Sequence, residues 1–156
     1  FYSPRLAGMY NEWLDEGFAR PGARRSRADF EVCPTAQVMV TDDRPAALAM
    51  MKPILALYMG GMGAEDTNFH ADLYRRAGYS DVVDDVTTLF RTGRKYEAAR
   101  IIPDELVDDA AIIGDVDYVR RQIALWEDCG VTMMVVAAHS AEHIRQLADL
   151  VPDQNR

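Results

Sequence analysis

The chain has 156 residues, and its 17 Lys and Arg against 25 Asp and Glu give a formal net charge of −8. This charge argues against a nucleic-acid partner or an anionic membrane bound through bulk electrostatics. With 49% hydrophobic, 9% aromatic and 27% charged residues, the chain has the composition of one ordinary soluble globular domain, not of a disordered, collagen-like or disulfide-stapled one.

Neither the cysteines nor the apolar runs indicate export or a membrane. Cys33 and Cys129 lack the number and the paired spacing of a disulfide framework or a zinc site, so we expect two buried thiols. The longest uncharged stretch, residues 53–64, is too short to cross a bilayer, and no secretion signal opens the chain. We therefore expect a cytoplasmic protein, and because the chain begins at Phe1 we expect further sequence before it.

The elements of the first half follow from caps, prolines and apolar spacing. They are a helix from Ser3-Pro4 to about Gly17, a strand at 35–40, a helix from Pro45 that Pro53 kinks or restarts, and a glycine-rich connection at 59–63. The second half follows with a helix capped by Thr67, a helix capped by Ser80, a short helix at 96–101, a helix from Asp115 to Gly130, a strand at 131–138 and a last helix from Ser140.

The order of strand, helical crossover, strand and helix is typical of an α/β protein. The continuous apolar run at 131–138 is typical of a parallel strand that is covered on both faces. Two strands cannot form such a sheet alone, so we expect the remaining strands to come from preceding sequence or from another chain. A complete (β/α)₈ barrel needs roughly 250 residues, so this chain holds only part of one if it is a barrel.

Two groups of residues invite a chemical interpretation. The glycines at 60, 61 and 63 could cradle a phosphate, but they follow a helix and lack both dinucleotide and P-loop spacing, which favours a hinge or lid. His139 and His143 have the i, i+4 spacing of a metal pair without a third ligand, and we expect no metal. His139 also follows the last strand, where barrel enzymes place their sites, which suggests a pocket role.

Several stretches together resemble the C-terminal half of the F420-dependent branch of the luciferase-like monooxygenase superfamily. They include Val38-Met39-Val40-Thr41-Asp42-Asp43, Leu57-Tyr58-Met59-Gly60-Gly61-Met62-Gly63, Asn68-Phe69-His70, Arg76-Ala77-Gly78-Tyr79, Ile102-Pro103-Asp104-Glu105, Ile113-Gly114-Asp115 and Gly130-Val131-Thr132. The resemblance covers essentially the whole chain, and the tyrosine–glycine segment with the Asn-Phe-His helix is its most specific part.

This resemblance implies an α/β fold that is the C-terminal portion of a (β/α)₈ TIM barrel, with a helical insertion at about 58–109 over the pocket. It implies an oxidoreductase in which coenzyme F420, a deazaflavin, exchanges hydride with a small organic substrate; FMN is the alternative cofactor. No catalytic residue is assigned. The implied pocket and lid residues are Tyr58, Gly60, Gly61, Met62, Gly63, Asn68, Phe69, His70 and Arg76, to which His139 is added for its place after the last strand.

The same resemblance leaves open what this chain does alone. The family's phosphate-gripping loop lies in its N-terminal half and is absent here, so we expect the isolated chain to lack a complete site and to be inactive. The alternatives are a non-catalytic truncated barrel that self-associates and an FMN-dependent monooxygenase of the same superfamily. In each case we expect a homo-oligomer without a nucleic-acid or membrane partner.

Overall fold

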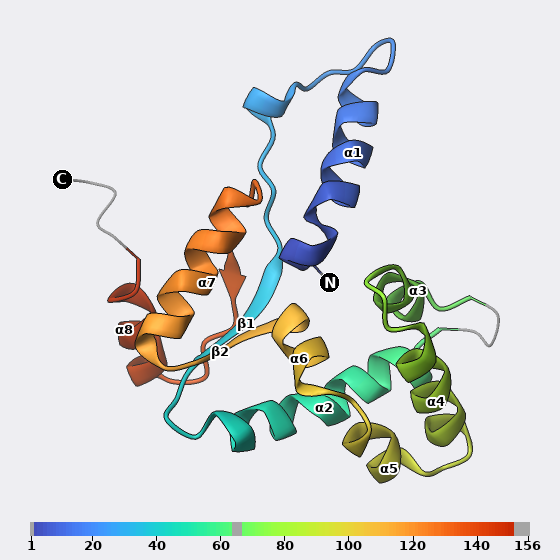
Figure 1. Ribbon diagram of the computed structural model, residues 1–156. Helices are drawn as coiled ribbons and strands as arrows, with labels where there is room; N and C mark the ends of the chain where they lie inside the picture. The colour runs from blue at the N-terminus through green and yellow to red at the C-terminus, as the bar shows by residue number, and fades with distance from the viewer. Residues whose placement is uncertain (1, 64–66, 152–156) are drawn as a thin grey trace. The chain divides into compact units, whose positions relative to one another are not determined.

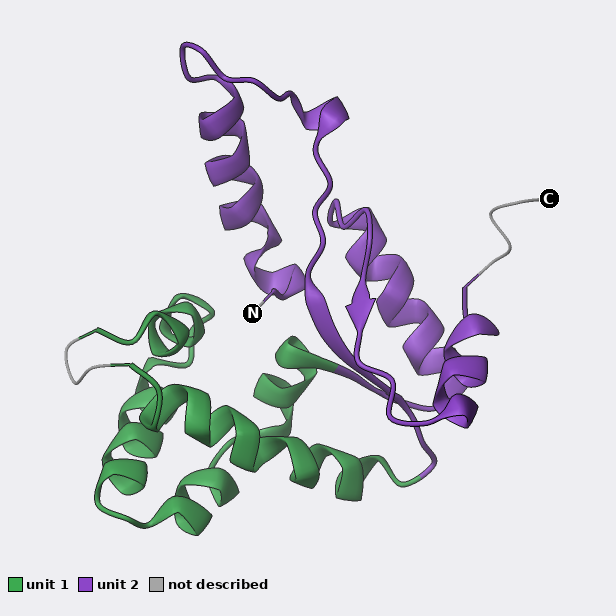
Figure 2. Ribbon diagram, turned by 180° about the vertical axis from the view of Figure 1, so that it is seen from behind, with its two compact units in different colours: residues 1, 43–111 green, residues 2–42, 112–156 purple. Residues whose placement is uncertain are grey.

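The computed structural model describes residues 2–63 and 67–151, which divide into two compact units (Figure 2). The helical unit comprises residues 43–111, and the sheet unit comprises residues 2–42 and those from Ile112 onward. No helix among the described residues is long and apolar enough to cross a membrane.

The sheet unit carries three strands in the order β2-β1-β3 (Figure 1). Its elements are the 3₁₀ turn η1 (Pro4–Leu6), α1 (Ala7–Phe18), the 3₁₀ turn η2 (Arg27–Asp29), β1 (Thr35–Val40), β2 (Ala111–Gly114), α7 (Val116–Asp128), β3 (Val135–Val136) and α8 (Ala141–Ala148). β1 pairs with β3 in parallel, with Thr35 opposite Val135 and Ala36 opposite Val136. In Figure 1, α7 and α8 lie beside the strands, and α1 lies beside the segment that leads into β1.

The predicted strand at 131–138 was too long, and β2 was missed. Pro34 has no N–H, so it cannot complete a regular ladder beside residues 131–134. Instead Thr132 and Met133 both donate a backbone N–H to the carbonyl of Val32, and regular pairing begins only at Val135. β2 escaped prediction because its apolar residues are too few to show a period, although Ala111, Ile112 and Ile113 are all buried.

The core of the sheet unit lies where α1 and α7 meet the strands. The Tyr2 and Trp126 rings lie 5.3 Å apart, and the Tyr2 hydroxyl donates to the carbonyl of Cys129 at 3.2 Å. The buried members are Tyr2, Ala7, Ala36, Val38, Ile112, Val119, Trp126, Val131 and Leu150. The expected burial of Cys33 was wrong, because its side chain is exposed. Trp13 on α1, a large aromatic residue for which the apolar face of a helix favours burial, is 47% exposed.

The helical unit packs four shorter helices against one long one. α2 (Arg44–Gly60) contacts α3 (Phe69–Arg76), α4 (Ser80–Arg91), α5 (Lys95–Arg100) and α6 (Asp104–Ala110). The expected restart at Pro53 does not occur, since α2 runs through it. Pro53 costs the helix only the hydrogen bond to Ala49, and burial of Leu48, Met51 and Leu55 around it compensates.

Two predicted caps shift by one residue. Asn68, not Thr67, caps α3: its side-chain oxygen accepts from the backbone N–H groups of His70 and Ala71, both at 3.1 Å. Tyr79 occupies the cap position of α4, and Ser80 is its first helical residue. Asp43, Asp115 and Ser140 cap α2, α7 and α8, the last two as predicted.

Candidate functional site

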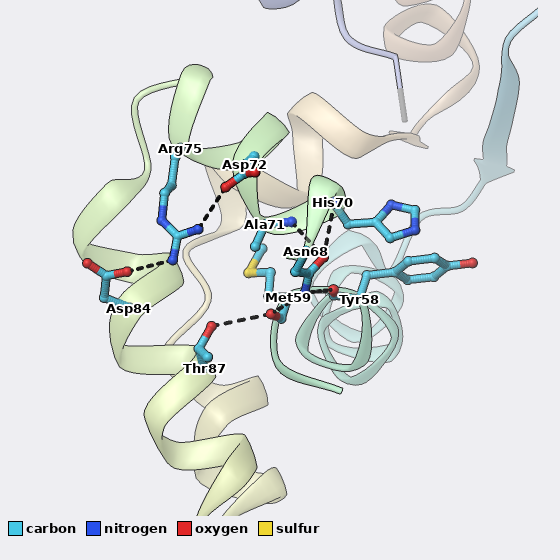
Figure 3. A network of polar contacts seen from close by, with 9 residues as sticks. All are labelled: Tyr58, Met59, Asn68, His70, Ala71, Asp72, Arg75, Asp84 and Thr87. Carbon is cyan, nitrogen blue, oxygen red and sulfur yellow. Dashed lines mark hydrogen bonds and ion pairs between the residues drawn. The ribbon is translucent and has the colours of Figure 1, made fainter. Parts of the chain in front are cut away.

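Asn68 is the central polar residue among the predicted site residues (Figure 3). Besides capping α3, it uses its amide nitrogen to donate to the carbonyls of Tyr58 at 3.0 Å and Met59 at 2.8 Å. The buried amide therefore donates both of its hydrogens to carbonyls in the last turn of α2, and its oxygen accepts from the first turn of α3. Asn68 fixes the position of its neighbours and has no hydrogen left to offer a ligand.

The neighbours that Asn68 positions form an aromatic cluster, Tyr58, Phe69 and His70. The imidazole of His70 lies edge-on to the Tyr58 ring, with centroids 4.6 Å apart at 76°. The Phe69 ring lies 3.9 Å from the imidazole centroid, and Phe69 is 67% exposed. Such a cluster presents a flat apolar surface with an imidazole beside it, which is suited to a planar ring.

Burial controls the protonation of this cluster. It lowers the pKa of His70 from its ordinary value of 6.5, so the imidazole is neutral at pH 7 and acts as a hydrogen-bonding group rather than a cation. Burial, followed by the charge of nearby Tyr58, raises the pKa of Tyr74, one turn after His70, far above its ordinary 10.0. The imidazole of the cluster is therefore uncharged at neutral pH.

The glycines of the predicted hinge have packing roles. A Cβ on Gly60 would lie 2.5 Å from Cβ of Phe90, and a Cβ on Gly61 would lie 2.6 Å from Cε1 of the same ring. Gly63 has φ of +87°, and a Cβ there would approach the Thr67 carbonyl to 2.7 Å. The three glycines let the end of α2 pack closely against α4 and turn toward α3, a contact for which hinge motion is not needed.

The two remaining candidates of the helical unit lie at exposed positions. Met62, beyond the end of α2, is 40% exposed, and Arg76 is exposed at the last turn of α3. Its neighbour Arg75 ion pairs with Asp72 at 3.1 Å and with Asp84 at 2.8 Å, which ties α3 to α4. Sequence reasoning could not choose between the adjacent arginines, because both lie on one helical turn.

His139 lies in the sheet unit, after the short strand β3. Its backbone N–H donates to Nδ1 of His143 at 3.4 Å, and the two imidazoles stack with centroids 5.8 Å apart. Nε2 of His143 lies 2.9 Å from the carbonyl of Val38 on β1. An acceptor Nδ1 and a donor Nε2 are compatible with one neutral tautomer, so both nitrogens of His143 are engaged. Sequence reasoning missed this positioning role, since Val38 is 105 residues away.

Acidic residues follow the strands of the sheet unit. The backbone N–H of Thr41, after β1, donates to the carbonyl of Gly114, the last residue of β2, at 2.8 Å, which brings the carboxyl ends of the two strands together. Asp42 follows the first strand, and Asp115 follows the second, where it caps α7. Within the described ranges no three His, Cys, Asp or Glu residues come close enough to hold a metal ion.

Comparison with known proteins identifies the family. The family model described as luciferase-like monooxygenase matches residues 5–133. The chain belongs to this family. It is 76% identical over 151 residues to a Mycobacterium tuberculosis protein that carries the provisional name coenzyme F420-dependent oxidoreductase, across 97% of this chain and 44% of that protein.

A solved structure of low sequence identity supports the fold. The coenzyme F420-dependent tetrahydromethanopterin reductase from Methanopyrus kandleri superposes on 96% of this chain with a TM-score of 0.72 at 17% identity. The superposition covers 42% of that reductase, so this luciferase-like chain spans less than half the length of either relative. The expected α/β fold, a portion of a luciferase-like barrel, is confirmed.

Proposed function

We propose that this chain is a portion of an F420-dependent oxidoreductase in which the deazaflavin exchanges hydride with a small organic substrate. The identity of 76% over nearly the whole chain, to a protein whose provisional name states this cofactor, carries the proposal. At such identity, side chains that shape a pocket are largely shared between two proteins. The bound cofactor supplies the hydride chemistry, and the protein supplies orientation and exclusion of water.

The described residues fit one part of a deazaflavin and not another. The uncharged surface of Tyr58, Phe69 and His70 suits a planar ring, and the neutral imidazole can exchange a hydrogen bond with a ring heteroatom. The strand ends of the sheet unit carry carboxylates, Asp42 and Asp115, which would repel a phosphate. We therefore assign to this chain a contact with a planar ring, of the cofactor or of the substrate, and no phosphate grip.

Within this proposal each residue around Asn68 has a separate role in holding the planar ring. Asn68 positions the cluster, Phe69 and Tyr58 cover an apolar face and keep water from it, and His70 orients the ring by hydrogen bonding. The glycines let the end of α2 pack closely against α4 beside the cluster. Opening of this segment about Gly60, Gly61 and Gly63 remains a further proposal, as does the pocket role of Met62, Arg76 and His139.

Direct titration with cofactor tests the proposal. We expect saturable binding of F420 to the full polypeptide of which this chain is proposed to be a portion, followed by fluorescence or equilibrium dialysis, and weaker binding of FMN. Phe69→Ala and His70→Ala should each weaken F420 binding about tenfold, the loss of about 1.4 kcal/mol of contact. Leu125→Ala, a truncation of an exposed residue on α7, is the matched control and should bind as the parent does. Absence of F420 binding, or tighter binding of FMN, would contradict the proposed cofactor.

A second candidate, self-association, is favoured by the apolar edge of the sheet. β3 has a strand partner on one side only among the described residues, and Val135 is 49% exposed. Unpaired strand edges with exposed apolar side chains promote pairing with another chain. Sedimentation velocity should show concentration-dependent association that Val135→Lys reduces; a monomer at every concentration would exclude this candidate and the homo-oligomer.

A further inference from the structure

A second concave site lies within the helical unit, between α2 and α5. It is a cavity of about 450 Å³, a size typical of small-molecule pockets. Its lining residues are Ala49, Lys52, Pro53, Lys95, Tyr96, Ala99 and Arg100. The space exists because small or ring-shaped side chains face each other where α2 and α5 meet.

The charge of this cavity opposes that of the chain. Three lining residues are cations and none is a carboxylate, in a chain of net charge −8. Lys52 is neutralised by an ion pair with Asp104 at 2.6 Å. The Lys95 ammonium lies 5.1 Å from the Phe90 ring centroid. The hydrogen-bonded ion pair with Arg94 lowers the pKa of Glu97 and the charge of Arg100 helps to lower it, but Arg100 makes no ion pair with any residue in the described ranges. Two cations are therefore available to an anion from solvent.

The rest of the lining is apolar and flat. Ala49 and Pro53 are separated by one turn of α2, and Ala99 faces them from α5, so the floor carries no polar side chain. At the rim, Tyr96 is 86% exposed, an unusual exposure for a large aromatic side chain. An aromatic ring at the mouth of an apolar floor is a platform on which a flat ligand can stack.

We propose that this cavity, the α2–α5 pocket, binds a small organic anion that joins a carboxylate or phosphate group to a flat apolar body. Lys95 and Arg100 hold the anionic group, Tyr96 stacks on the body, and Ala49, Pro53 and Ala99 form its floor. Arg100 pairs with either group in a bidentate manner, which explains why carboxylates and phosphates share the site. The pocket lies outside the Tyr58–Phe69–His70 cluster and does not depend on the oxidoreductase proposal.

Calorimetric titration of the protein tests the pocket with four probes. Phenyl phosphate and benzoate carry both features, phenol carries only the ring, and inorganic phosphate carries only the charge. We expect saturable binding of phenyl phosphate, benzoate or both with a Kd on the order of 1 mM or tighter, and at least about tenfold weaker binding of phenol and inorganic phosphate. Equal binding of phenol or of inorganic phosphate would overturn the proposal, as would the absence of saturable binding by both organic anions.

Matched variants locate the binding. Lys95→Gln with Arg100→Gln removes two exposed cations and should weaken the organic anion at least about tenfold. Arg20→Gln with Arg24→Gln removes the same charge from exposed positions in the sheet unit and should bind like the parent. Ala49→Phe keeps every cation but fills the floor from an exposed helix position, and it should abolish binding while circular dichroism stays unchanged. Parent-like affinity in the first or the third variant would overturn the assignment.

Discussion

The helical unit and the sheet unit differ in which elements cover their apolar side chains. In the helical unit, α4, α5 and α6 pack against α2, and Met59, Val86 and Leu106 are fully buried, although Met50 and Ile54 on α2 remain exposed. In the sheet unit, α7 contacts β1, but Met133, just before β3, and Val135, in β3, are about half exposed. A bundle can satisfy its apolar faces with local neighbours, whereas an open sheet needs a strand or helix beyond each edge.

The largest expected effect is the difference in the free energy of unfolding between a buried and an exposed Leu→Ala variant. Leu106→Ala removes a fully buried side chain from the helical unit and should lower the free energy of unfolding by about 2–5 kcal/mol. Leu125→Ala, the same change at an exposed position of α7, should change it by no more than about 0.5 kcal/mol. Urea denaturation of the two variants measures the difference; similar values would mean that the helical unit is not packed as described.

A smaller effect tests how closely α2 meets α4. Gly60→Ala places a Cβ 2.5 Å from Phe90 and should destabilise the chain by about 1–3 kcal/mol. Gly8→Ala in α1, where nothing lies within 4 Å, should stabilise it by up to about 1 kcal/mol. Thermal unfolding distinguishes the expected loss of stability in Gly60→Ala from the expected gain in Gly8→Ala. If Gly60→Ala were also stabilising, the glycine would serve flexibility rather than packing, and the hinge proposal would gain support.

Removing the cap residue of α3 or of α8 should lower the stability by an amount similar to that of Gly60→Ala. Asn68→Ala loses the cap of α3 and both donors to α2, which should cost about 1–3 kcal/mol. Ser140→Ala loses only the cap of α8 and should cost about 1 kcal/mol. Asn68→Ser keeps a side-chain acceptor for the cap of α3 without the two amide donors and should fall between the parent and Asn68→Ala in urea denaturation. Equal losses in Asn68→Ala and Asn68→Ser would show that the donors, not the cap, matter.

The smallest expected effect is the pH dependence of the free energy of unfolding that arises from His70 in the helical unit. Burial lowers the pKa of His70 below 6.5, so the unfolded chain binds the proton more readily than the folded one. Stability is therefore complete above about pH 6.5, falls as the pH drops through the interval between the two pKa values, and levels off below it. Urea midpoints of the parent and His70→Gln from pH 8 to 5 should differ by a pH-dependent amount. A constant difference would contradict the lowered pKa.

Local patterns in the sequence predicted much of the helical unit. The spacing of Val82, Val83, Val86, Leu89 and Phe90 indicated α4, and the structure buries Val83 and Val86 as that spacing requires. Asp115 and Gly130 bounded α7 within two residues. These predictions succeed because caps and 3.6-residue periods depend on neighbours a few positions apart.

Long-range geometry explains the residues that sequence reasoning placed in the wrong role or missed. The packing role of the glycine run was missed because nothing local shows that Phe90 packs on Gly60 from 30 positions away, and the hinge stays a proposal. Likewise, an exposed Trp13 and the engagement of His143 with Val38 follow from how elements meet. The α2–α5 pocket had no sequence signature, since its cations belong to two helices that only the fold brings together.

The sequence by itself determined the family, the α/β class and the identity of most helices, because these rest on motifs and local periods. Only the tertiary structure decided that Asn68 is a positioning residue, that β1 lies between β2 and β3, and that two cations converge on one cavity. The physical reason is that hydrogen-bond saturation, strand order and cavity shape depend on contacts between distant residues, which no local pattern encodes.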